Sequence, residues 1–288
     1  MINSALFHNY LSQELGLGPF LNARPVSGGD VNQAYQFNFD KGSVFLKYQP
    51  EASRHFFESE AYALRALCEQ DIIAIAEPLL CASFEGEQFL VLKWISEGIR
   101  ASNYASNLAS GLAAIHRISA DQFGWPQDNF IGTLAQSNLE LSTWAEFYFY
   151  QRLERQFALA YDHGLTNSKD RKQLESLGRN LNSLLPAEKP ALLHGNLWSG
   201  NAIANSLGLP VLIDPSSYFG HREMDLAMMK LFGGFEPEVF RQYQEQFPLE
   251  GAWEERIPIH QLYPLLVHLN LFGGSYLGSC RAIWQGFN

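Results

Sequence analysis

The chain has 288 residues, of which 47% are hydrophobic and 17% are charged, a composition typical of a globular protein and not of a disordered one. Its formal net charge of −10 argues against a surface for nucleic acid or anionic membrane, because both are bound by clustered Lys and Arg. At this length the chain suits one large domain or two lobes.

The cysteines and the apolar stretches indicate a cytoplasmic protein. Cys68, Cys81 and Cys280 are far apart and odd in number, which disfavours a disulfide framework and fits a reducing compartment. The N-terminus has no basic region followed by a long apolar run, so no signal peptide is evident. The longest apolar stretch, residues 262–271, contains Pro, His and Asn and is too short to span a bilayer. We therefore expect neither a membrane nor nucleic acid as a partner.

The first segments predict a helix and then two strands around a turn. Residues 2–15 have the apolar spacing of a short amphipathic helix, which ends at Gly16. Residues 25–37 predict a strand, a turn with Gly28 and Gly29, and a returning strand. Adjacent glycines let the backbone approach a phosphate and present N–H groups to it, yet such a pair alone is more typical of an ordinary hairpin turn. Both interpretations stay open at this point.

A lysine interrupts the next apolar strand. Residues 44–48 predict a buried strand, and Lys47 within it is costly to bury unless its charge is paired. The helix predicted around residues 56–64 offers Glu60 as the partner, with Glu58 as the competing choice. The ordinary alternative is an edge-strand lysine in solvent opposite a glutamate on an exposed helix face.

The middle of the chain predicts further strands and then helices. Strands are expected at residues 72–78 and 88–92, and Leu92, Lys93 and Trp94 would then connect two lobes, although Trp94 fits plain core equally well. Apolar residues with helical spacing follow in three segments, at residues 103–116, 144–162 and 169–185. Between the first two of these helices, a turn-rich segment (residues 123–133) carries aromatic side chains that we expect to be exposed, as in loops that contact substrates.

A polar loop with a following Asp is the most informative stretch. His194 comes after an apolar lead-in, Asn201 closes the loop, and a short apolar strand then ends at Asp214. An Asn amide oxygen and a carboxylate are ligands that Mg²⁺ accepts, and such a pair can hold the ion against the phosphates of ATP. The alternative is a turn between two strands in which His194 and the Asn side chains only satisfy hydrogen bonds.

In its order and spacing this stretch resembles the catalytic loop and metal-binding Asp of the protein-kinase-like phosphotransferases, whose loop runs H-x-D-L-x-x-x-N. His194 and Asn201 are in register with that pattern, whereas Asn196 stands where the family has an Asp that acts as the base. The resemblance implies an α+β, two-lobed protein-kinase-like fold. A small β-rich N-lobe is expected at residues 1–94 and a larger, mainly helical C-lobe at residues 95–288.

Beyond this loop, a helix is expected to begin after Gly220. Asp225 near its start could bind a metal or the substrate. Its more ordinary role is structural, either accepting backbone N–H groups or pairing with Arg222.

The chain as a whole resembles the fructosamine (ketosamine) kinases, within the aminoglycoside-phosphotransferase-like branch of the kinase fold. The similarity extends over nearly the whole chain, and residues 197–201 (Leu-Trp-Ser-Gly-Asn) are its most family-specific part. The matching segments are residues 28–34, 45–47, 57–61, 129–132, 194–201, 214–215, 220–227 and 271–274.

This resemblance implies ATP-dependent phosphorylation of the C3 hydroxyl of a ketoamine such as fructoselysine, free or protein-bound, with ATP and Mg²⁺ as cofactors. The product is unstable and releases the amine, so the activity would repair glycated amines and proteins. By position in the family pattern, Lys47 would bind the phosphates, Glu60 would orient Lys47, and Gly28 and Gly29 would lie over the phosphates. Leu92, Lys93 and Trp94 would line the adenine site, and Asn201 and Asp214 would bind the metal. Asn196 and Trp198 would lie on the substrate side.

The departure at Asn196 bears on activity. An Asn amide cannot take a proton at neutral pH, but it can still orient a hydroxyl. Because general-base help is worth about 10²–10⁴-fold, we expect slowed turnover. Two alternatives remain: a kinase for another hydroxylated amine, such as an aminoglycoside or choline, and a nucleotide-binding pseudokinase, which Asn196 alone supports. Trp198 with the following Ser-Gly favours ketoamines, and the pattern makes no prediction of the oligomeric state.

Overall fold

The computed structural model describes residues 1–26, 33–50 and 52–287, and by their internal contacts the residues of the chain group into two units. The N-terminal unit comprises Met1–Asn107 and Gly200–Pro215, and the C-terminal unit comprises Leu108–Ser199 and Ser216–Asn288. The N-lobe and C-lobe expected at residues 1–94 and 95–288 remain a prediction.

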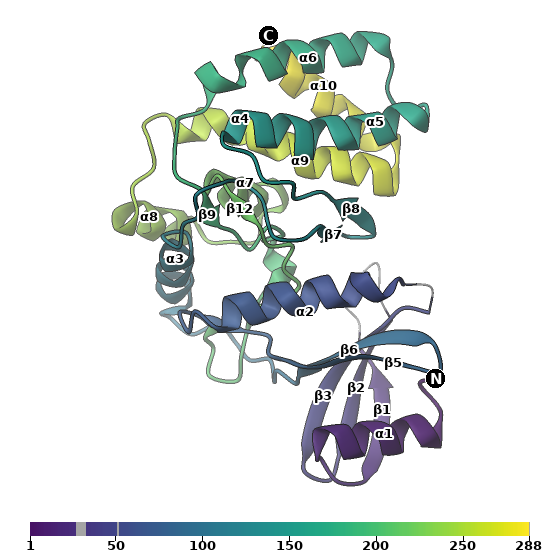
Figure 1. Ribbon diagram of the computed structural model, residues 1–288. Helices are drawn as coiled ribbons and strands as arrows, with labels where there is room; N and C mark the ends of the chain where they lie inside the picture. Colours follow the sequence, from purple (N-terminus) through teal and green to yellow (C-terminus); the bar gives the residue numbers. More distant parts are fainter. Residues whose placement is uncertain (27–32, 51, 288) are drawn as a thin grey trace. The chain divides into compact units, whose positions relative to one another are not determined.

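The N-terminal unit is mainly β-structure (Figure 1). Its elements are α1 (Ala5–Leu15), β1 (Phe20–Pro25), β2 (Gln33–Phe39), β3 (Gly42–Tyr48), α2 (Arg54–Cys68), β4 (Ala74–Ile75), β5 (Pro78–Phe84), β6 (Glu87–Lys93), β10 (Ala202–Ala204) and β11 (Pro210–Leu212). Helix α3 (Tyr104–Ile115) begins in this unit, and the short 3-10 turn Ser199–Asn201 leads back into it.

The main sheet of this unit has the strand order β1-β2-β3-β6-β5, with every neighbouring pair antiparallel. Because successive side chains of a strand point to opposite faces, β3 divides its residues between two clusters. Val44 and Leu46 pack in a core with Phe7 of α1, whereas Phe45 packs against Phe57 of α2 and its neighbours. Lys47 follows the alternation of Phe45 and therefore points to the face that α2 covers.

A second, smaller sheet brings a distant segment into the same unit. Strand β11 pairs antiparallel with β10 and parallel with β4, in the order β10-β11-β4. The strand expected at residues 72–78 is thus shorter than predicted, and its two residues pair with β11 in this sheet, while β5 begins only at Pro78. Ile213, directly after β11, packs against the same cluster as α2. This pairing joins Gly200–Pro215 to the N-terminal unit.

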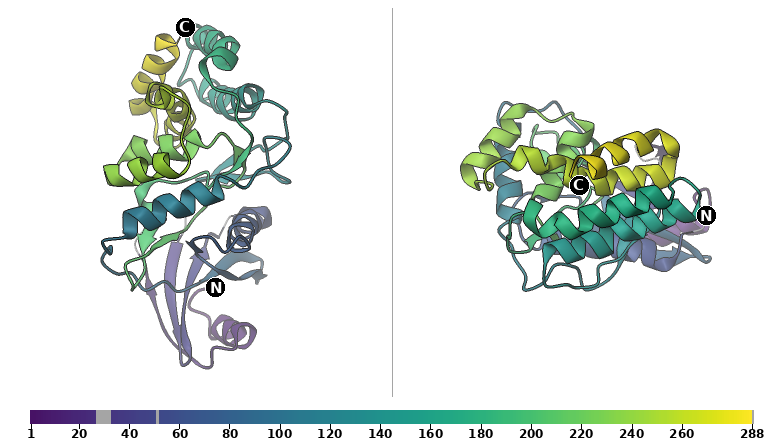
Figure 2. Two further views of the ribbon diagram at one scale, coloured as in Figure 1. Left: turned by 90° about the vertical axis from the view of Figure 1, so that its left-hand side faces the viewer. Right: turned by 90° about the horizontal axis from the view of Figure 1, so that it is seen from above.

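The C-terminal unit is mainly helical, and Figure 2 shows the teal helices α4, α5 and α6 beside the yellow helices α9 and α10. Its elements are β7 (Asn129–Ile131), β8 (Leu134–Gln136), α4 (Trp144–Phe147), the π-helical turn Tyr148–Leu153, α5 (Glu154–Asp162), α6 (Ser168–Leu184), β9 (Ala191–Leu192), β12 (Phe219–Gly220), α7 (Glu223–Phe232), α8 (Pro237–Gln246), α9 (Trp253–Phe272), the 3-10 turn Gly274–Tyr276 and α10 (Leu277–Gly286). The helices predicted at residues 144–162 and 169–185 are confirmed, the first as one run with a π-helical turn inside it.

One expectation about this unit is wrong. The aromatic residues Phe123 and Trp125 in the turn-rich segment are buried, at 4% and 7% exposure. Phe123 bonds to the backbone of Leu141 and packs on Trp144, and Trp125 packs on Phe219. The segment supplies core contacts because its turns direct the rings inward. No helix among the described residues is both long and apolar enough to cross a membrane.

A buried ion-pair cluster connects α7 and α9. Arg256 donates to both carboxylate oxygens of Glu223, and His260 Nε2 lies 3.3 Å from Glu223 Oε2. Burial by itself would raise the pKa of Glu223, but the bonds from His260 and Arg256 outweigh it and lower the pKa to about 2. The carboxylate therefore stays ionised, and the guanidinium is its counter-charge.

Replacing Glu223 by Ala is expected to lower the free energy of unfolding by about 3–5 kcal/mol, because Arg256 would then be a buried charge without its partner. Urea unfolding measures this. The matched control is Glu58→Ala, which removes an exposed pair with Arg54 on α2 and should cost less than about 1 kcal/mol. Equal losses in the two variants would contradict the assignment.

A second prediction concerns pH. Burial and the neighbouring His260 lower the pKa of His221 to about 4, whereas an unfolded chain has its histidines near pKa 6.5. Between these values the unfolded state binds a proton that the native state does not, so the free energy of unfolding falls as pH is lowered from about 6.5 to 4. Urea unfolding of the wild type and of His221→Gln across this window should show a shallower fall for the variant; parallel curves would refute the prediction.

Candidate active site

Lys47 is held by two carboxylates in the N-terminal unit. Its Nζ lies 2.6 Å from Glu60 Oε1 and also forms an ion pair with Asp214 Oδ1. The pairing with Glu60 predicted from the sequence is confirmed, and the competing Glu58 pairs instead with Arg54 at 2.7 Å. The side chains of Lys47 and Glu60 are each only 10% exposed, whereas Asp214 is 42% exposed. The contact with Asp214 had no signal in the sequence.

Burial disfavours the charged form of both Lys47 and Glu60, so it shifts their pKa values in opposite directions. It would lower the pKa of Lys47, but Asp214 and Glu60 outweigh it and raise that pKa, so the ammonium persists. Burial also raises the pKa of Glu60 to about 7, against the attraction of Lys47. Asp214 is the more exposed carboxylate, and it can turn from Lys47 toward a cation at little desolvation cost.

Asn201 and Asp214 flank the same end of the β10–β11 hairpin. Ala202 pairs with Leu212, and the backbone N–H of Ile213 donates to the carbonyl of Asn201 at 3.0 Å. An amide oxygen and a carboxylate at one hairpin end are the donor types that Mg²⁺ prefers, so these residues fit the ion. Asp214 has a φ of 55°, an uncommon conformation outside glycine that is found disproportionately at functional positions.

The other residues predicted to bind the nucleotide are Gly28, Gly29 and the segment from Leu92 to Trp94. Gly28 and Gly29 lie outside the described residues. Leu92 is buried in the cluster under α2, and the Lys93 side chain is exposed and pairs with Glu77 at 3.0 Å. The backbone N–H of Lys93 also donates to the carbonyl of Glu77, so it is already used within the unit. Trp94 is partly exposed, and the adenine-binding role of this segment stays a prediction.

The loop around position 196 belongs to the C-terminal unit. It begins after β9, at His194, and turns at Gly195, whose φ is 79°. A Cβ at Gly195 would overlap the carbonyl oxygen of Ser216, so this turn requires glycine for space as well as for conformation. The backbone N–H of Asn196 donates to His194 Nδ1 at 3.3 Å, and its carbonyl accepts from the N–H of Trp198 at 3.1 Å. Trp198 is 42% exposed.

Asp225, at the start of α7, anchors this loop. Its carboxylate accepts the backbone N–H groups of His194 at 2.8 Å and Gly195 at 2.9 Å. Of the two structural roles predicted for Asp225, the backbone one is confirmed and the pairing with Arg222 is wrong, because that guanidinium binds both oxygens of Glu188. Burial alone would raise the pKa of Asp225, but the bond from His116 and the other donors lower it, so the anchor stays ionised.

Two supporting residues behind Asp225 could not be found from spacing. The Nε2 of His116 lies 3.2 Å from Asp225 Oδ2, and its Nδ1 lies 2.7 Å from the Tyr243 hydroxyl, so both ring nitrogens are hydrogen-bonded. His116 and Tyr243 are fully buried, at 2% and 0% exposure. His116 directly follows α3 and Tyr243 lies in α8, far apart in the sequence, so only the packing of these segments brings them together.

The predicted site residues therefore fall into two groups. Lys47, Glu60, Asn201 and Asp214 lie together in the N-terminal unit, and Asn196 and Trp198 lie together in one loop of the C-terminal unit. Their roles toward ATP, metal and sugar stay predictions.

One other set of described side chains offers metal-ligand atoms. His221, Glu223 and His260 are buried, and one donor atom from each lies within 4.8 Å of the others. Both oxygens of Glu223 already accept from Arg256, so the set is best described as the structural ion-pair cluster of α7 and α9.

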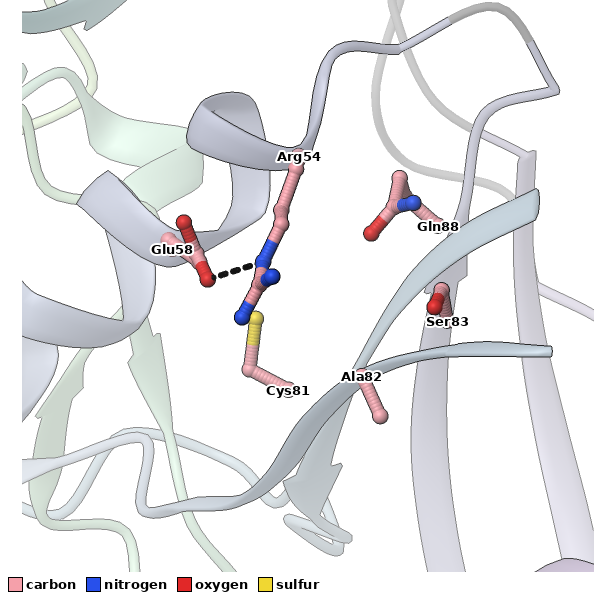
Figure 3. A pocket seen from close by; sticks show the side chains of 6 residues that line it. All are labelled: Arg54, Glu58, Cys81, Ala82, Ser83 and Gln88. Atoms are coloured by element: carbon pink, nitrogen blue, oxygen red, sulfur yellow. Dashed lines mark hydrogen bonds and ion pairs between the residues drawn. The ribbon is translucent and has the colours of Figure 1, made fainter. Parts of the chain in front are cut away.

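A pocket of about 310 Å³ lies beside the start of α2 (Figure 3), and Lys47 is not among its lining residues. Burial and the nearby Glu58 raise the pKa of the Cys81 thiol to about 11, so this cysteine is protonated at neutral pH and a poor nucleophile. The lining residues are Arg54, Glu58, Cys81, Ala82, Ser83 and Gln88.

Comparison with known proteins assigns the family. A family model described as fructosamine kinase matches residues 6–286. A probable ketoamine kinase of Enterococcus faecium is 41% identical over 265 residues, which are 91% of this chain and 94% of that protein. The crystal structure of a putative fructosamine-3-kinase from Haemophilus somnus matches with a TM-score of 0.88 and 26% identity, over 98% of this chain and 96% of that one.

A more distant similarity concerns the fold alone. The crystal structure of an aminoglycoside phosphotransferase matches with a TM-score of 0.63 and 17% identity, over 98% of both chains. The predicted α+β fold, with a β-rich N-terminal region and a helical C-terminal region, is confirmed. With a family model that extends over almost its whole length, this chain belongs to the fructosamine kinase family and is a phosphotransferase with a protein-kinase-like fold.

Proposed function

We propose that the protein transfers the γ-phosphoryl group of ATP to the C3 hydroxyl of a ketoamine in the cytoplasm. The names of its relatives, ketoamine kinase and fructosamine-3-kinase, support the substrate class. The observation that carries the chemistry is the Lys47 ammonium held between Glu60 and Asp214. A buried cation with a fixed orientation beside a half-exposed carboxylate suits binding of a polyphosphate with its counter-ion.

On the nucleotide side, Lys47 binds phosphate oxygens, and Glu60 keeps its ammonium charged and oriented. Asn201 and Asp214 are the residues that would hold Mg²⁺, which supplies charge neutralisation for the transferring phosphoryl group when it is bound. Gly28 and Gly29 would lie over the phosphates, and the segment from Leu92 to Trp94 would contact the adenine.

On the acceptor side, Asn196 orients the sugar hydroxyl through its amide oxygen, and Trp198 offers its exposed ring to the sugar. Because an amide is not a base, the hydroxyl proton must leave to solvent or phosphate. In a loose phosphoryl-transfer transition state this proton moves late, so positioning alone sustains a reduced rate.

Replacing Lys47 by Met is expected to lower kcat about 10²–10³-fold, because the enzyme loses a preorganised cation that stabilises the negative charge of the phosphates. The assay is phosphate transfer from Mg-ATP to fructoselysine, read as product mass. Lys41→Met, at the β2–β3 turn of the same sheet, is the matched control and should keep wild-type activity. A Lys47→Met enzyme with unchanged kcat would remove the lysine from the proposed mechanism.

Replacing Asn196 by Asp is expected to raise kcat by about 10²–10⁴-fold, since it restores a proton acceptor beside the hydroxyl. Asn103→Asp, at an exposed helix start, is the control and should have no effect. An unchanged rate in Asn196→Asp would refute the hydroxyl-specific role of position 196.

The same assay separates the alternatives. Transfer to an aminoglycoside or to choline, but not to fructoselysine, would show that the acceptor is another hydroxylated amine and not a ketoamine. ATP binding without transfer to any acceptor, in both the wild type and Asn196→Asp, would favour a nucleotide-binding pseudokinase.

A further inference from the structure

Four ring side chains form a partly exposed cluster at the end of α9 in the C-terminal unit. The His268 ring centroid lies 4.7 Å from that of Phe232 and 5.3 Å from those of both Phe272 and Tyr276. Phe272 is 52% exposed and Phe232 39% exposed. We call Phe232, His268, Phe272 and Tyr276 the aromatic cluster. Two partly exposed phenylalanine rings, both in contact with one histidine, form an exposed apolar surface, and such surfaces are common at ligand-binding sites.

The cluster has a fixed geometry. His268 Nδ1 lies 2.7 Å from the carbonyl of Pro264, one helical turn earlier, so this nitrogen carries the hydrogen and the ring orientation is set. The other three rings pack around that histidine from α7, from the last residue of α9 and from the 3-10 turn after it. Rings held in this way bind a ligand without a large loss of side-chain entropy.

The segment that follows Phe232 lies close to the loop that contains Asn196 and Trp198. A Cβ at Gly234, two residues after Phe232, would lie 2.6 Å from the Cβ of Ser199, which directly follows Trp198. At 3.8 Å between successive Cα atoms, Phe232 and Trp198 are therefore on neighbouring stretches of backbone. Trp198 is the exposed ring that we assign to the sugar, so the Phe232 side of the aromatic cluster belongs to the same region of the C-terminal unit.

The chemistry of a ketoamine matches these two surfaces. One end is a sugar with hydroxyl groups, and the other is a secondary amine, which is protonated at neutral pH and continues into an alkyl chain when the amine is a lysine. Aromatic faces bind such a cation through their quadrupole and its methylene groups through apolar contact. The chain's net charge of −10 adds long-range attraction for a cation.

We propose that the aromatic cluster binds the alkylammonium side of the ketoamine and so selects substrates by their amine. This inference rests on the proposed function, since it concerns the acceptor of that reaction. Phe272 is its principal contact because it is the most exposed ring of the four.

The test compares Phe272→Ala, Phe272→Leu and Phe272→Trp with the wild type on two ketoamines, one made from an Nα-blocked lysine and one from methylamine. For the lysine ketoamine, Phe272→Ala should raise KM about tenfold with kcat unchanged, because a binding contact is lost equally from ground and transition states. Phe272→Leu, which keeps apolar area but no ring, should be intermediate, and Phe272→Trp should retain binding. The KM for the methylamine ketoamine, which has no alkyl chain beyond its methyl group, should rise less than the KM for the lysine ketoamine.

Controls keep failure of this inference separate from failure of the proposed function. Tyr150→Ala removes another exposed ring of the same unit, 52% exposed, and should leave both substrates unaffected. Titration calorimetry with a lysine ketoamine that lacks the C3 hydroxyl measures binding without turnover and should show the same tenfold weakening in Phe272→Ala. Unchanged KM and affinity in Phe272→Ala, or an equal effect of Tyr150→Ala, would overturn the inference. A wild type that phosphorylates neither ketoamine would instead overturn the proposed function and this inference with it.

Discussion

The counter-charges of Lys47 are the constraint on which the N-terminal unit depends. A lysine that is one-tenth exposed is tolerated only when carboxylates replace the water it has lost. One carboxylate comes from α2 and the other from the end of β11, more than 150 residues later in the chain. Lys47, Glu60 and Asp214 meet only if three conditions hold. Strand β11 must pair with β4, α2 must pack on the main sheet, and the side chain of Lys47 must point to the face of β3 that α2 covers. The site is thus a consequence of the packing and cannot form from any one of these elements alone.

In the C-terminal unit, hydrogen bonds to a buried carboxylate hold the sharply turned loop after β9 in one conformation. Asp225 accepts two consecutive backbone N–H groups, and a buried histidine and tyrosine hold the anchor in turn. His194, Asp225, His116 and Tyr243 are buried and Gly195 is partly buried, so loss of one partner would leave buried polar groups without a hydrogen bond. This support positions Asn196, and the ring of Trp198 is exposed, as their proposed contacts with a substrate require.

The departure at Asn196 stands out because the other residues of the family pattern are present, each within its own unit. The glycine turn, the Asp225 anchor, the Asn and Asp on the hairpin and the Lys47 ion pair are all present. Phosphoryl transfer relies mainly on charge neutralisation and positioning, so in the proposed mechanism the loss of the proton acceptor alone leaves most of the catalytic groups in place. In the proposed reaction, the aromatic cluster at the end of α9 would bind the amine side of the acceptor and Trp198 would contact the sugar, so both contacts would come from the C-terminal unit.

Residue patterns in the sequence identified the family, the α+β fold class and Glu60 as the first choice of partner for Lys47, with Glu58 still in competition. These follow from residue spacing, and spacing is local information: a period of two marks β3, a helical period marks α2, and a fixed interval separates His194 from Asn201. Tertiary structure alone decided which distant groups meet. It brought Asp214 to Lys47, placed His116 and Tyr243 behind Asp225, and turned Phe123 and Trp125 into the core where the sequence predicted exposure. Those outcomes depend on sheet pairing and helix packing between segments far apart in the chain, and no local pattern of residues encodes such contacts.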